Sequence, residues 1–432
     1  MTLISLGSLY ARGAGRHGER LRAFQDRRLR DVVTRARSVP YYRELLDGAG
    51  IEPGDVGAVD EIAMIPSSSK DDLRRWPESE RLSAGSRRRL IRRATTGSTG
   101  KPFSVLRTLN EELAVGGLWE LALARIGARP HQLSVALLDP AFERRVLPRR
   151  VAERVGLFRR HHLDARLPRE DLAAELIGTS PDLVVGYVSM LARAASVLGQ
   201  RPTGGWRPRF VFTAGETLTA SARRLIESGF GTRPFNMYGA AELGVLAYDC
   251  PSGARTMHVC DEGLILEVRR DGRPANPGEA GEVVGTALHS RAMPFIRYET
   301  GDRAVRGPQP CPCGWPGTTL LSVEGRLIET FRLPGGRWLH PVTIVGAIAD
   351  LELGWADEHR LIQEDEDLVV MQFVPLREPA KKELTEIRSR AAAILGPEVR
   401  LRVELVDRLA EVPGPKRRPF ISRLSEGAAT RT

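Results

Sequence analysis

Cysteine is scarce in this sequence, and uninterrupted apolar stretches are short. The 432 residues include four cysteines, two of them in Cys311-Pro312-Cys313. So few cysteines argue against a disulfide-stabilised scaffold and favour metal binding. No run of about 18 uncharged apolar residues occurs, so we expect no transmembrane helix and no membrane partner. The opening residues place arginines after a short apolar run, the reverse of a secretory signal, and we therefore expect a cytoplasmic protein.

Aromatic residues are also few, at 6% of the chain, whereas basic residues are in excess. Lysine and arginine outnumber the acidic residues 64 to 54, which gives a net charge of +10 spread along the sequence. Such a charge suits nucleic acid or small anionic ligands. The sequence contains no nucleic-acid-binding motif. We therefore expect no nucleic-acid partner and attribute the charge to binding of nucleotide phosphates.

Glycine and hydroxyl residues concentrate in one stretch, TTGSTGKP. Glycine lets successive backbone N–H groups turn toward one anion, and hydroxyl and ammonium groups add further donors. The spacing is not that of a P-loop, because two residues rather than four separate the glycines and a proline follows the lysine. A glycine-rich surface turn is the alternative interpretation. The residues of this candidate phosphate loop are Thr95, Thr96, Gly97, Ser98, Thr99, Gly100 and Lys101.

Beyond this loop, segments of helical and strand character alternate. The pattern predicts helices at 111–126, 169–177, 190–198 and 220–227, and strands at 133–138, 183–185 and 210–212. This alternation predicts a parallel α/β sheet, whose ligands bind where loops leave the carboxyl ends of strands. Two turns with glycine and glutamate follow, and we expect them to share one site. They contain Gly215 and Glu216, and then Asn236, Met237, Tyr238, Gly239, Ala240, Ala241 and Glu242.

From about residue 245 to 325, short predicted strands alternate with glycine and proline turns, which indicates a smaller β subdomain. It contains Cys250, His258, Cys260, Cys311 and Cys313. Four nitrogen or sulfur ligands make a closed tetrahedral zinc site, so we predict structural zinc held by Cys250, His258, Cys311 and Cys313. Cys260 could replace either upstream ligand. The alternative is a set of buried, unpaired cysteines.

The sequence changes character again near Arg326, where short strand and helix segments alternate up to the end of the chain. Before this junction, Asp302 lies in a glycine turn, where its carboxylate could accept two ribose hydroxyls, and Arg326 could donate to the same sugar or to phosphate. We predict an α/β protein with a large N-terminal domain at 1–325, which contains mixed or parallel sheets and the β subdomain. A small α+β domain should follow at 326–432.

The order of these segments resembles that of the adenylate-forming enzymes, the superfamily of the acyl-CoA synthetases. The matching segments are TTGSTGKP, Gly215-Glu216, YGAAE at 238–242, YETGD at 298–302, Gly325-Arg326 and Lys416 in a late basic loop. Three further stretches resemble the phenylacetate-CoA ligase branch: QDRRLRDVVTRARSVPYYRELLDGAGIEP, PDLVVGYVSML and CPCG. The resemblance covers nearly the whole chain.

The resemblance implies a ligase that activates a small aryl or other carboxylic acid with ATP and transfers the acyl group from an acyl-adenylate to a thiol, expected to be coenzyme A. It implies that Ser98, Thr99, Gly100 and Lys101 hold the ATP β- and γ-phosphates. Gly215, Glu216 and residues 236–238 would line the adenine, and Asp302 and Arg326 would contact the ribose. Glu242 would bind Mg²⁺. Lys416, carried on a mobile C-terminal domain, would approach the α-phosphate and the carboxylate.

The sequence departs from the family pattern at two informative positions. Ala241 offers no hydroxyl where the family has threonine or serine, and Ile328 replaces the hinge acid, with Glu329 beside it. One alternative is an adenylating enzyme that delivers the acyl group to an amine, a hydroxyl or a carrier protein. The other is a catalytically weakened nucleotide-binding accessory protein, for which Ala241 and Ile328 are the support.

Overall fold

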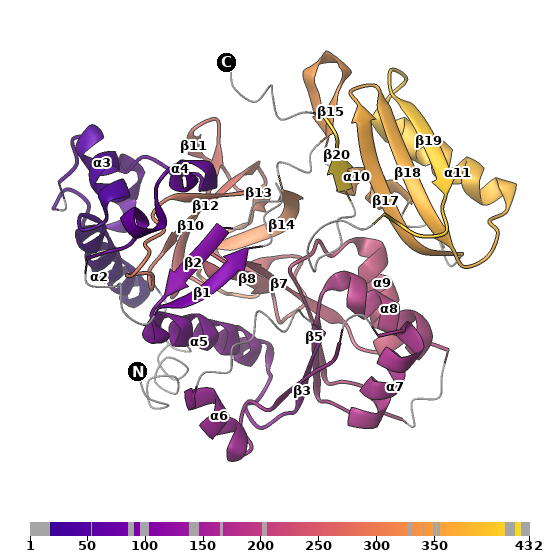
Figure 1. Cartoon of the computed structure of the whole chain (residues 1–432), viewed down its shortest axis with the longest axis horizontal. Coiled ribbons are helices and arrows are strands. Elements are labelled where there is room, and N and C mark those ends of the chain that lie inside the picture. Colours follow the sequence, from indigo (N-terminus) through magenta and orange to yellow (C-terminus); the bar gives the residue numbers. More distant parts are fainter. Residues whose placement is uncertain are drawn as a thin grey trace.

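The computed structural model describes residues 18–52, 54–84, 90–95, 103–137, 147–164, 167–200, 205–326, 331–339, 341–348, 351, 355–410 and 420–424 (Figure 1). Its α-helices are α2 (Glu19–Ala36), α3 (Pro40–Gly48), α4 (Lys70–Arg74), α5 (Leu109–Ile126), α6 (Leu147–Arg154), α7 (Arg169–Thr179), α8 (Val188–Leu198), α9 (Ala220–Phe230), α10 (Val342–Ile348) and α11 (Lys381–Leu395). Short 3₁₀ helices occur at η1 (Val59–Met64), η2 (Glu78–Arg81) and η5 (Pro334–Gly336).

A 12-stranded mixed sheet dominates the described part of the chain, in the order β11-β10-β12-β13-β14-β9-β8-β7-β6-β5-β3-β4. Strands β4, β3, β5, β6 and β7 pair in parallel, and the pairing becomes antiparallel from β7 to β8 onward. The strands are β3 (Ser134–Leu137), β4 (Arg160–His162), β5 (Leu183–Gly186), β6 (Phe210–Ala214), β7 (Pro234–Ala240), β8 (Gly244–Asp249), β9 (Met257–Val259), β10 (Leu264–Arg270), β11 (Arg273–Pro274), β12 (Ala280–Ala287), β13 (Tyr298–Arg306) and β14 (Thr319–Arg326).

The predicted α/β class is therefore confirmed, and the region at 245–325 is rich in strands as expected. These strands do not form a separate sheet among the described residues, because β8 and β9 join them edge to edge to the parallel strands. Strand β13 begins at Tyr298. Before that point the amides of Ile296 and Arg297 donate to the hydroxyls of Tyr42 and Thr286, at 3.0 and 2.9 Å.

A separate antiparallel hairpin, β1 (Ile91–Thr95) and β2 (Phe103–Arg107), leads into α5. Thr108 begins that helix as a capping box: its side chain accepts from the amide of Glu111, whose carboxylate in turn accepts from the amide of Thr108. Such a cap satisfies amides that the first helical turn leaves without partners. Gly127, at a φ of 115°, ends α5 in the left-handed conformation. Both ends of α5 are thus determined by local sequence.

The last part of the chain has its own apolar core. Strands β17 (Ala356–Asp365), β18 (Leu368–Pro375), β19 (Arg400–Leu405) and β20 (Phe420–Ser422) form a four-stranded sheet, and β15 (Phe331–Leu333) pairs with β16 (Arg337–Leu339). The buried side chains of this region, from Phe331 to Phe420, pack with one another as one cluster. In Figure 1 this region lies at one side of the molecule, beyond α8 and α9.

None of the helices in the described ranges is both long enough and apolar enough to cross a membrane.

Helices α8 and α9 approach each other unusually closely at Gly229. A Cβ atom added there would lie 2.4 Å from the carbonyl oxygen and 2.5 Å from the Cα of Ala195. These neighbours are backbone atoms of the facing helix, which cannot rotate away as a side chain could. The absence of a side chain at Gly229 therefore sets the distance between the two helices.

We expect Gly229→Ala to destabilise the fold by about 1–3 kcal/mol, because the helices must separate to accommodate the added methyl group. Gly178→Ala is the matched control: this glycine is also helical, and nothing lies within 4 Å of the Cβ that it would gain. Alanine there should be neutral or stabilise by about 0.5–1 kcal/mol through helix propensity. Urea unfolding followed by circular dichroism measures both. Equal stability of the two variants would contradict the close approach.

Candidate functional site

A cavity of about 910 Å³ lies where the carboxyl ends of the parallel strands β5 and β6 lead into α8 and α9. This edge is where open α/β sheets bind ligands. The first turns of α8 and α9 contribute to the wall, and so do the turn at 215–219, the end of β7, the turn at 253–257, and β14. The opposite wall comes from the C-terminal region, at 356–360 and at Leu376, Leu409 and Phe420.

The cavity gathers most of the nucleotide-binding residues predicted from the sequence whose side chains the structure describes. They come from three separate segments of the chain and meet on one wall. The cavity-lining members are Gly215, Glu216, Asn236, Met237, Tyr238, Gly239 and Asp302.

Among the described residues of this lining positive charge predominates, with six arginines and four carboxylates. The arginines are Arg193, Arg223, Arg224, Arg233, Arg255 and Arg360, and the acids are Glu216, Asp249, Asp302 and Glu358. The helices α8 and α9 also begin at the cavity, and the N-terminal end of a helix carries partial positive charge. This electrostatic environment favours an anionic ligand.

Glu216 binds the start of α8. Its carboxylate accepts hydrogen bonds from the amide of Ser189 at 2.7 Å and from the Ser189 hydroxyl at 3.0 Å. A carboxylate at the first turn of a helix satisfies an amide and interacts favourably with the helix dipole. Glu216 therefore joins the turn after β6 to the start of α8, which fixes one corner of the cavity.

Asp302 and Tyr238 connect two strands across the cavity wall. The Tyr238 hydroxyl donates to Oδ2 of Asp302 at 2.7 Å, and the Asp302 amide donates to the hydroxyl of Thr300 at 3.1 Å. Arg326 lies directly opposite Asp302 in the pairing of β13 with β14. The predicted ribose-binding residues are therefore adjacent in the sheet, although Asp302 lies in a strand rather than in the turn that the sequence suggested.

Asn236 is held by two neighbours. Its side-chain oxygen accepts from the Thr213 hydroxyl at 3.0 Å, and its backbone amide donates to Oδ2 of Asp249 at 3.1 Å. Asp249 also forms an ion pair with Arg223 at 2.9 Å. Strands β6, β7 and β8 are thereby joined by side-chain contacts as well as by their backbone pairing.

Glu242 is buried, with its side chain 5% exposed, and it does not line the cavity among the described residues. Its Oε1 atom lies 2.8 Å from Nζ of Lys70 and 3.0 Å from the hydroxyl of Tyr298. Burial by itself would raise the pKa of Glu242, but attraction and hydrogen bonding by the Lys70 ammonium and the Tyr298 hydroxyl outweigh it and lower the pKa. The carboxylate is therefore ionised at neutral pH, the form that binds hard cations such as Mg²⁺.

A second polar group lies at the ends of β8 and β9, where Cys250, His258, Cys311 and Cys313 place one ligand atom each within 4.8 Å of one another. Nε2 of His258 is 3.4 Å from Sγ of Cys313, and its ring stacks on Trp315 with 5.0 Å between centroids. Burial lowers the pKa of His258 to about 4, so the imidazole is neutral at pH 7 and can act as a ligand. Cys260 is outside the group.

Several predicted site residues fall outside the described part of the chain. They are the phosphate-loop residues Thr96, Gly97, Ser98, Thr99, Gly100 and Lys101, together with Ile328, Glu329 and Lys416. For Thr95 and Arg326 only the backbone is described, at the ends of β1 and β14. The described part of the hairpin ends with the pairing of Thr95 with Phe103.

Sequence reasoning missed Lys70, Tyr298 and Ser189, each of which holds a predicted site residue. One signal was available for Lys70, which occupies the first position of α4 after the Ser69 cap. A cation is unfavourable at a helix N-terminus, so a lysine there suggests a specific partner elsewhere. For Tyr298 and Ser189, the sequence contains no comparable signal.

Comparison with known proteins gives consistent results. No protein-family model matches the chain. The chain is 30% identical over 331 residues to the phenylacetate-coenzyme A ligase of Thermus thermophilus. This match covers 73% of each of the two sequences. It is 28% identical over 297 residues to the phenylacetate-coenzyme A ligase of Escherichia coli, covering 66% of this chain and 67% of that one.

Solved structures show the same fold. A 2-hydroxyisobutyryl-CoA ligase in the postadenylation state, in complex with 2-HIB-AMP, matches with a TM-score of 0.77 at 21% identity and covers 93% of this chain and 89% of that one. The anthranilate CoA ligase AuaEII in complex with anthranoyl-AMP matches with a TM-score of 0.58 at 17% identity. The match covers 82% of this chain and 73% of that one.

The Glu242 contacts predict how stability changes with pH. Because its pKa is lowered in the fold, the ionised carboxylate stabilises the protein at neutral pH, and this contribution is lost only as pH falls through the lowered value. In Lys70→Met the effect of burial remains without the ammonium, so the pKa of Glu242 should rise above its ordinary value. The free energy of unfolding of this variant should then fall as pH rises, and at pH 8 it should be about 3 kcal/mol below that of the wild type.

Thermal melting at pH 5 and pH 8 measures this effect. The double variant Lys70→Met with Glu242→Gln is the control, since it has no carboxylate to titrate and should show no added pH dependence. If Lys70→Met loses equal stability at both pH values, the ion pair does not determine the charge state of Glu242.

Proposed function

The chain belongs to the phenylacetate-coenzyme A ligase family, and on that basis we propose that it forms an acyl-adenylate from ATP and a small carboxylic acid and transfers the acyl group to coenzyme A. The observation that carries this proposal is the convergence of Gly215, Glu216, residues 236–239 and Asp302 on one arginine-rich cavity. Those are the positions at which the sequence resemblance implies nucleotide binding. An aryl acid is the proposed substrate class, in line with the relatives' names.

We propose the following roles for the residues of the cavity wall. Asp302 accepts the ribose hydroxyls, and Tyr238 orients its carboxylate through the 2.7 Å hydrogen bond. Gly215, Glu216 and residues 236–238 border the adenine. Glu216 already satisfies the first turn of α8, so its contribution is to fix the shape of this corner. Arg326, opposite Asp302 in the sheet, donates to the ribose.

The chemistry requires positive charge, because the acid carboxylate attacks a phosphorus atom that already carries negative oxygens. We propose that Lys101 and the amides and hydroxyls of the phosphate loop bind the β- and γ-phosphates, and that Lys416 binds the α-phosphate and the attacking carboxylate. Glu242 is the proposed Mg²⁺ ligand, and its ionised state fits that role. When bound, Mg²⁺ supplies charge that stabilises the departing pyrophosphate.

The C-terminal region must carry Lys416 to this site, and we propose that residues 326–432 form a mobile domain. One observation supports the division from residues 1–325: the apolar cluster from Phe331 to Phe420 is composed only of residues from this region. Residues of the same region also line the cavity, which places the region beside the proposed site. Closure of this domain would bring Lys416 to the α-phosphate, and reopening would admit the thiol.

We expect Lys416→Ala to lower adenylation by about 100-fold or more, since it removes a cation that stabilises the transition state. ATP–pyrophosphate exchange with phenylacetate, anthranilate and 2-hydroxyisobutyrate measures this step. Thioester formation from a chemically supplied acyl-adenylate should be largely retained. Lys381→Ala, an exposed lysine of the same region, is the control and should leave both half-reactions unchanged.

The same exchange assay distinguishes the alternatives. Exchange without thioester formation would indicate delivery to an amine, a hydroxyl or a carrier protein. Binding of ATP with no exchange for any acid would favour the accessory role. Full adenylation by Lys416→Ala would contradict the assignment of this lysine.

We also propose that the cysteine–histidine group binds one structural zinc ion. Three thiol sulfurs and one neutral imidazole are a typical tetrahedral donor set, and all four ligands come from the protein, which leaves no position for a substrate. The four unpaired cysteines suit a reducing compartment, so we propose a cytoplasmic location, where ATP and coenzyme A are also available. The turn at 253–257, between Cys250 and His258, lines the cavity. Zinc would therefore hold part of the cavity wall.

We expect protein purified without chelator to contain about one zinc ion per chain. Cys311→Ser should lose the metal and melt at a lower temperature, because zinc binding contributes directly to folding free energy. Cys260→Ser is the matched control, since Cys260 is also buried but lies outside the group. Elemental analysis measures the zinc content of both variants, and thermal melting measures their stability. Absence of zinc in the wild-type protein, or its loss only from Cys260→Ser, would contradict the proposed ligand set.

A further inference from the structure

Two arginines project from one face of the β1–β2 hairpin into the protein interior. Arg93 pairs with Val105 across the hairpin and Arg107 pairs with Ile91, so the two arginines lie on the same face, two positions apart along the ladder. Arg93 is 9% exposed and Arg107 is 5% exposed. A buried guanidinium is costly unless charge and hydrogen bonds compensate it. Partners must therefore hold both side chains.

Glu112 is the shared partner. Its Oε1 accepts from Nε of Arg93 at 3.0 Å, and its Oε2 lies 3.6 Å from Nη1 of Arg107. It belongs to the first turn of α5, where a carboxylate also interacts favourably with the helix dipole. One acid therefore neutralises two cations only in part, and the remaining positive charge of Arg107 must be stabilised elsewhere.

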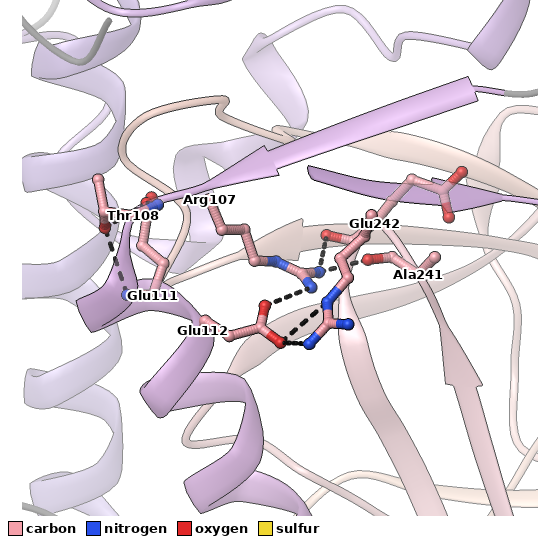
Figure 2. Close-up of polar contacts among 7 residues, drawn as sticks. Arg107, Thr108, Glu111, Glu112, Ala241 and Glu242 are labelled. Carbon is pink, nitrogen blue, oxygen red and sulfur yellow. Dashed lines mark hydrogen bonds and ion pairs between the residues drawn. The ribbon is translucent and has the colours of Figure 1, made fainter. Parts of the chain in front are cut away.

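Backbone carbonyls stabilise that remaining charge. Nη2 of Arg107 donates to the carbonyl oxygen of Ala241 and lies 3.4 Å from that of Glu242. Figure 2 shows Arg107 between Glu112 on one side and the two carbonyls on the other. These carbonyls belong to the turn between β7 and β8 that contains the proposed Mg²⁺ ligand. Arg107 therefore joins the hairpin, α5 and this turn.

We propose that Arg107 is a positioning residue that holds the backbone of Ala241 and Glu242, so that the Glu242 carboxylate is set in place before Mg²⁺ and ATP bind. Arg93 and Glu112 support it. The proposal rests on the proposed adenylation function. Arg107 contacts the backbone of Glu242 and interacts with its carboxylate only through charge, whereas Lys70 and Tyr298 contact the carboxylate directly. At position 241 only the carbonyl contributes, because alanine has no polar side chain.

A buried ion network could also serve stability alone. In that case, replacing Arg107 would reduce ATP binding, adenylation and thioester formation together, in proportion to the loss of folding free energy. A positioning role instead predicts a selective effect on binding of ATP with Mg²⁺, while ATP binding without the metal and thioester formation from a supplied acyl-adenylate are retained. The two explanations therefore differ in which steps change.

The experiment compares Arg107→Met with Arg125→Met in the full-length protein. Arg125 is a matched control, because it also lies in a buried pair, with Glu262, and its guanidinium lies over the ring of Trp315. Calorimetry would measure ATP affinity with MgCl₂ and with EDTA. We expect the gain in ATP affinity from Mg²⁺ to fall by about 10- to 100-fold in Arg107→Met, the usual effect of losing a residue that orients a metal ligand. In Arg125→Met it should stay at the wild-type value.

Two further variants keep the test decisive if Arg107→Met does not fold. Glu112→Gln retains shape and a hydrogen-bond acceptor and should show a smaller loss of the same selective kind. Arg107→Lys retains the charge and should recover part of the affinity gain. Half-reactions with phenylacetate and with supplied phenylacetyl-adenylate give the second readout, in which only adenylation should fall.

The results separate this inference from the proposed function. If the wild-type protein shows neither pyrophosphate exchange nor Mg²⁺-dependent ATP binding, the proposed function fails. If the wild-type protein shows both and the Arg107 and Glu112 variants match Arg125→Met in every readout, Arg107 is only structural and this inference is overturned. A uniform loss of both half-reactions in these variants would overturn it as well.

Discussion

The burial of a single ionised carboxylate, Glu242, constrains how several distant segments of this protein come together. A buried charge needs compensation, and here it comes from Lys70 at the start of α4 and Tyr298 at the start of β13. The backbone of the same residue is held by Arg107, at the end of β2. Three segments that are remote in sequence therefore meet at one turn, and an error in the placement of any of them would leave a charge uncompensated.

The mixed sheet explains why the cavity lies where it does. Parallel strands β5 and β6 bring the starts of α8 and α9 to one edge, and the switch to antiparallel pairing at β7 and β8 brings Asp302 and β14 to the same side. A purely parallel sheet would supply helix starts and glycine turns without this second group of polar side chains. The combination yields a cavity with the glycine turns and Asp302 on one wall and the C-terminal region on the other.

Much of the fold and part of the site could be predicted from the sequence, since they depend on local patterns. Helical periodicity, the capping sequence at Thr108 and the alternation of helix and strand are contained in short windows, and the two glycine turns expected to share a site, at 215 and 236–239, both line the cavity. The contacts to Glu242 were not predictable in this way. Arg107 lies 134 residues from Ala241, and Tyr298 lies 56 residues from Glu242, so only tertiary packing brings them together. Sequence likewise suggested a turn at Asp302, because a glycine next to an aspartate is common in turns and its presence inside a strand depends on pairing with β12 and β14.

The close approach of α8 and α9 at Gly229 has a mechanical consequence for ligand choice. Backbone packed against backbone cannot yield by rotamer changes, so the two helices form one stiff unit whose first turns face the cavity. Ala356, Glu358, His359, Arg360 and Phe420 line the cavity from the C-terminal region, outside this unit. Directed evolution toward larger or smaller acids should therefore accumulate substitutions outside this unit and leave the contact between Gly229 and Ala195 intact.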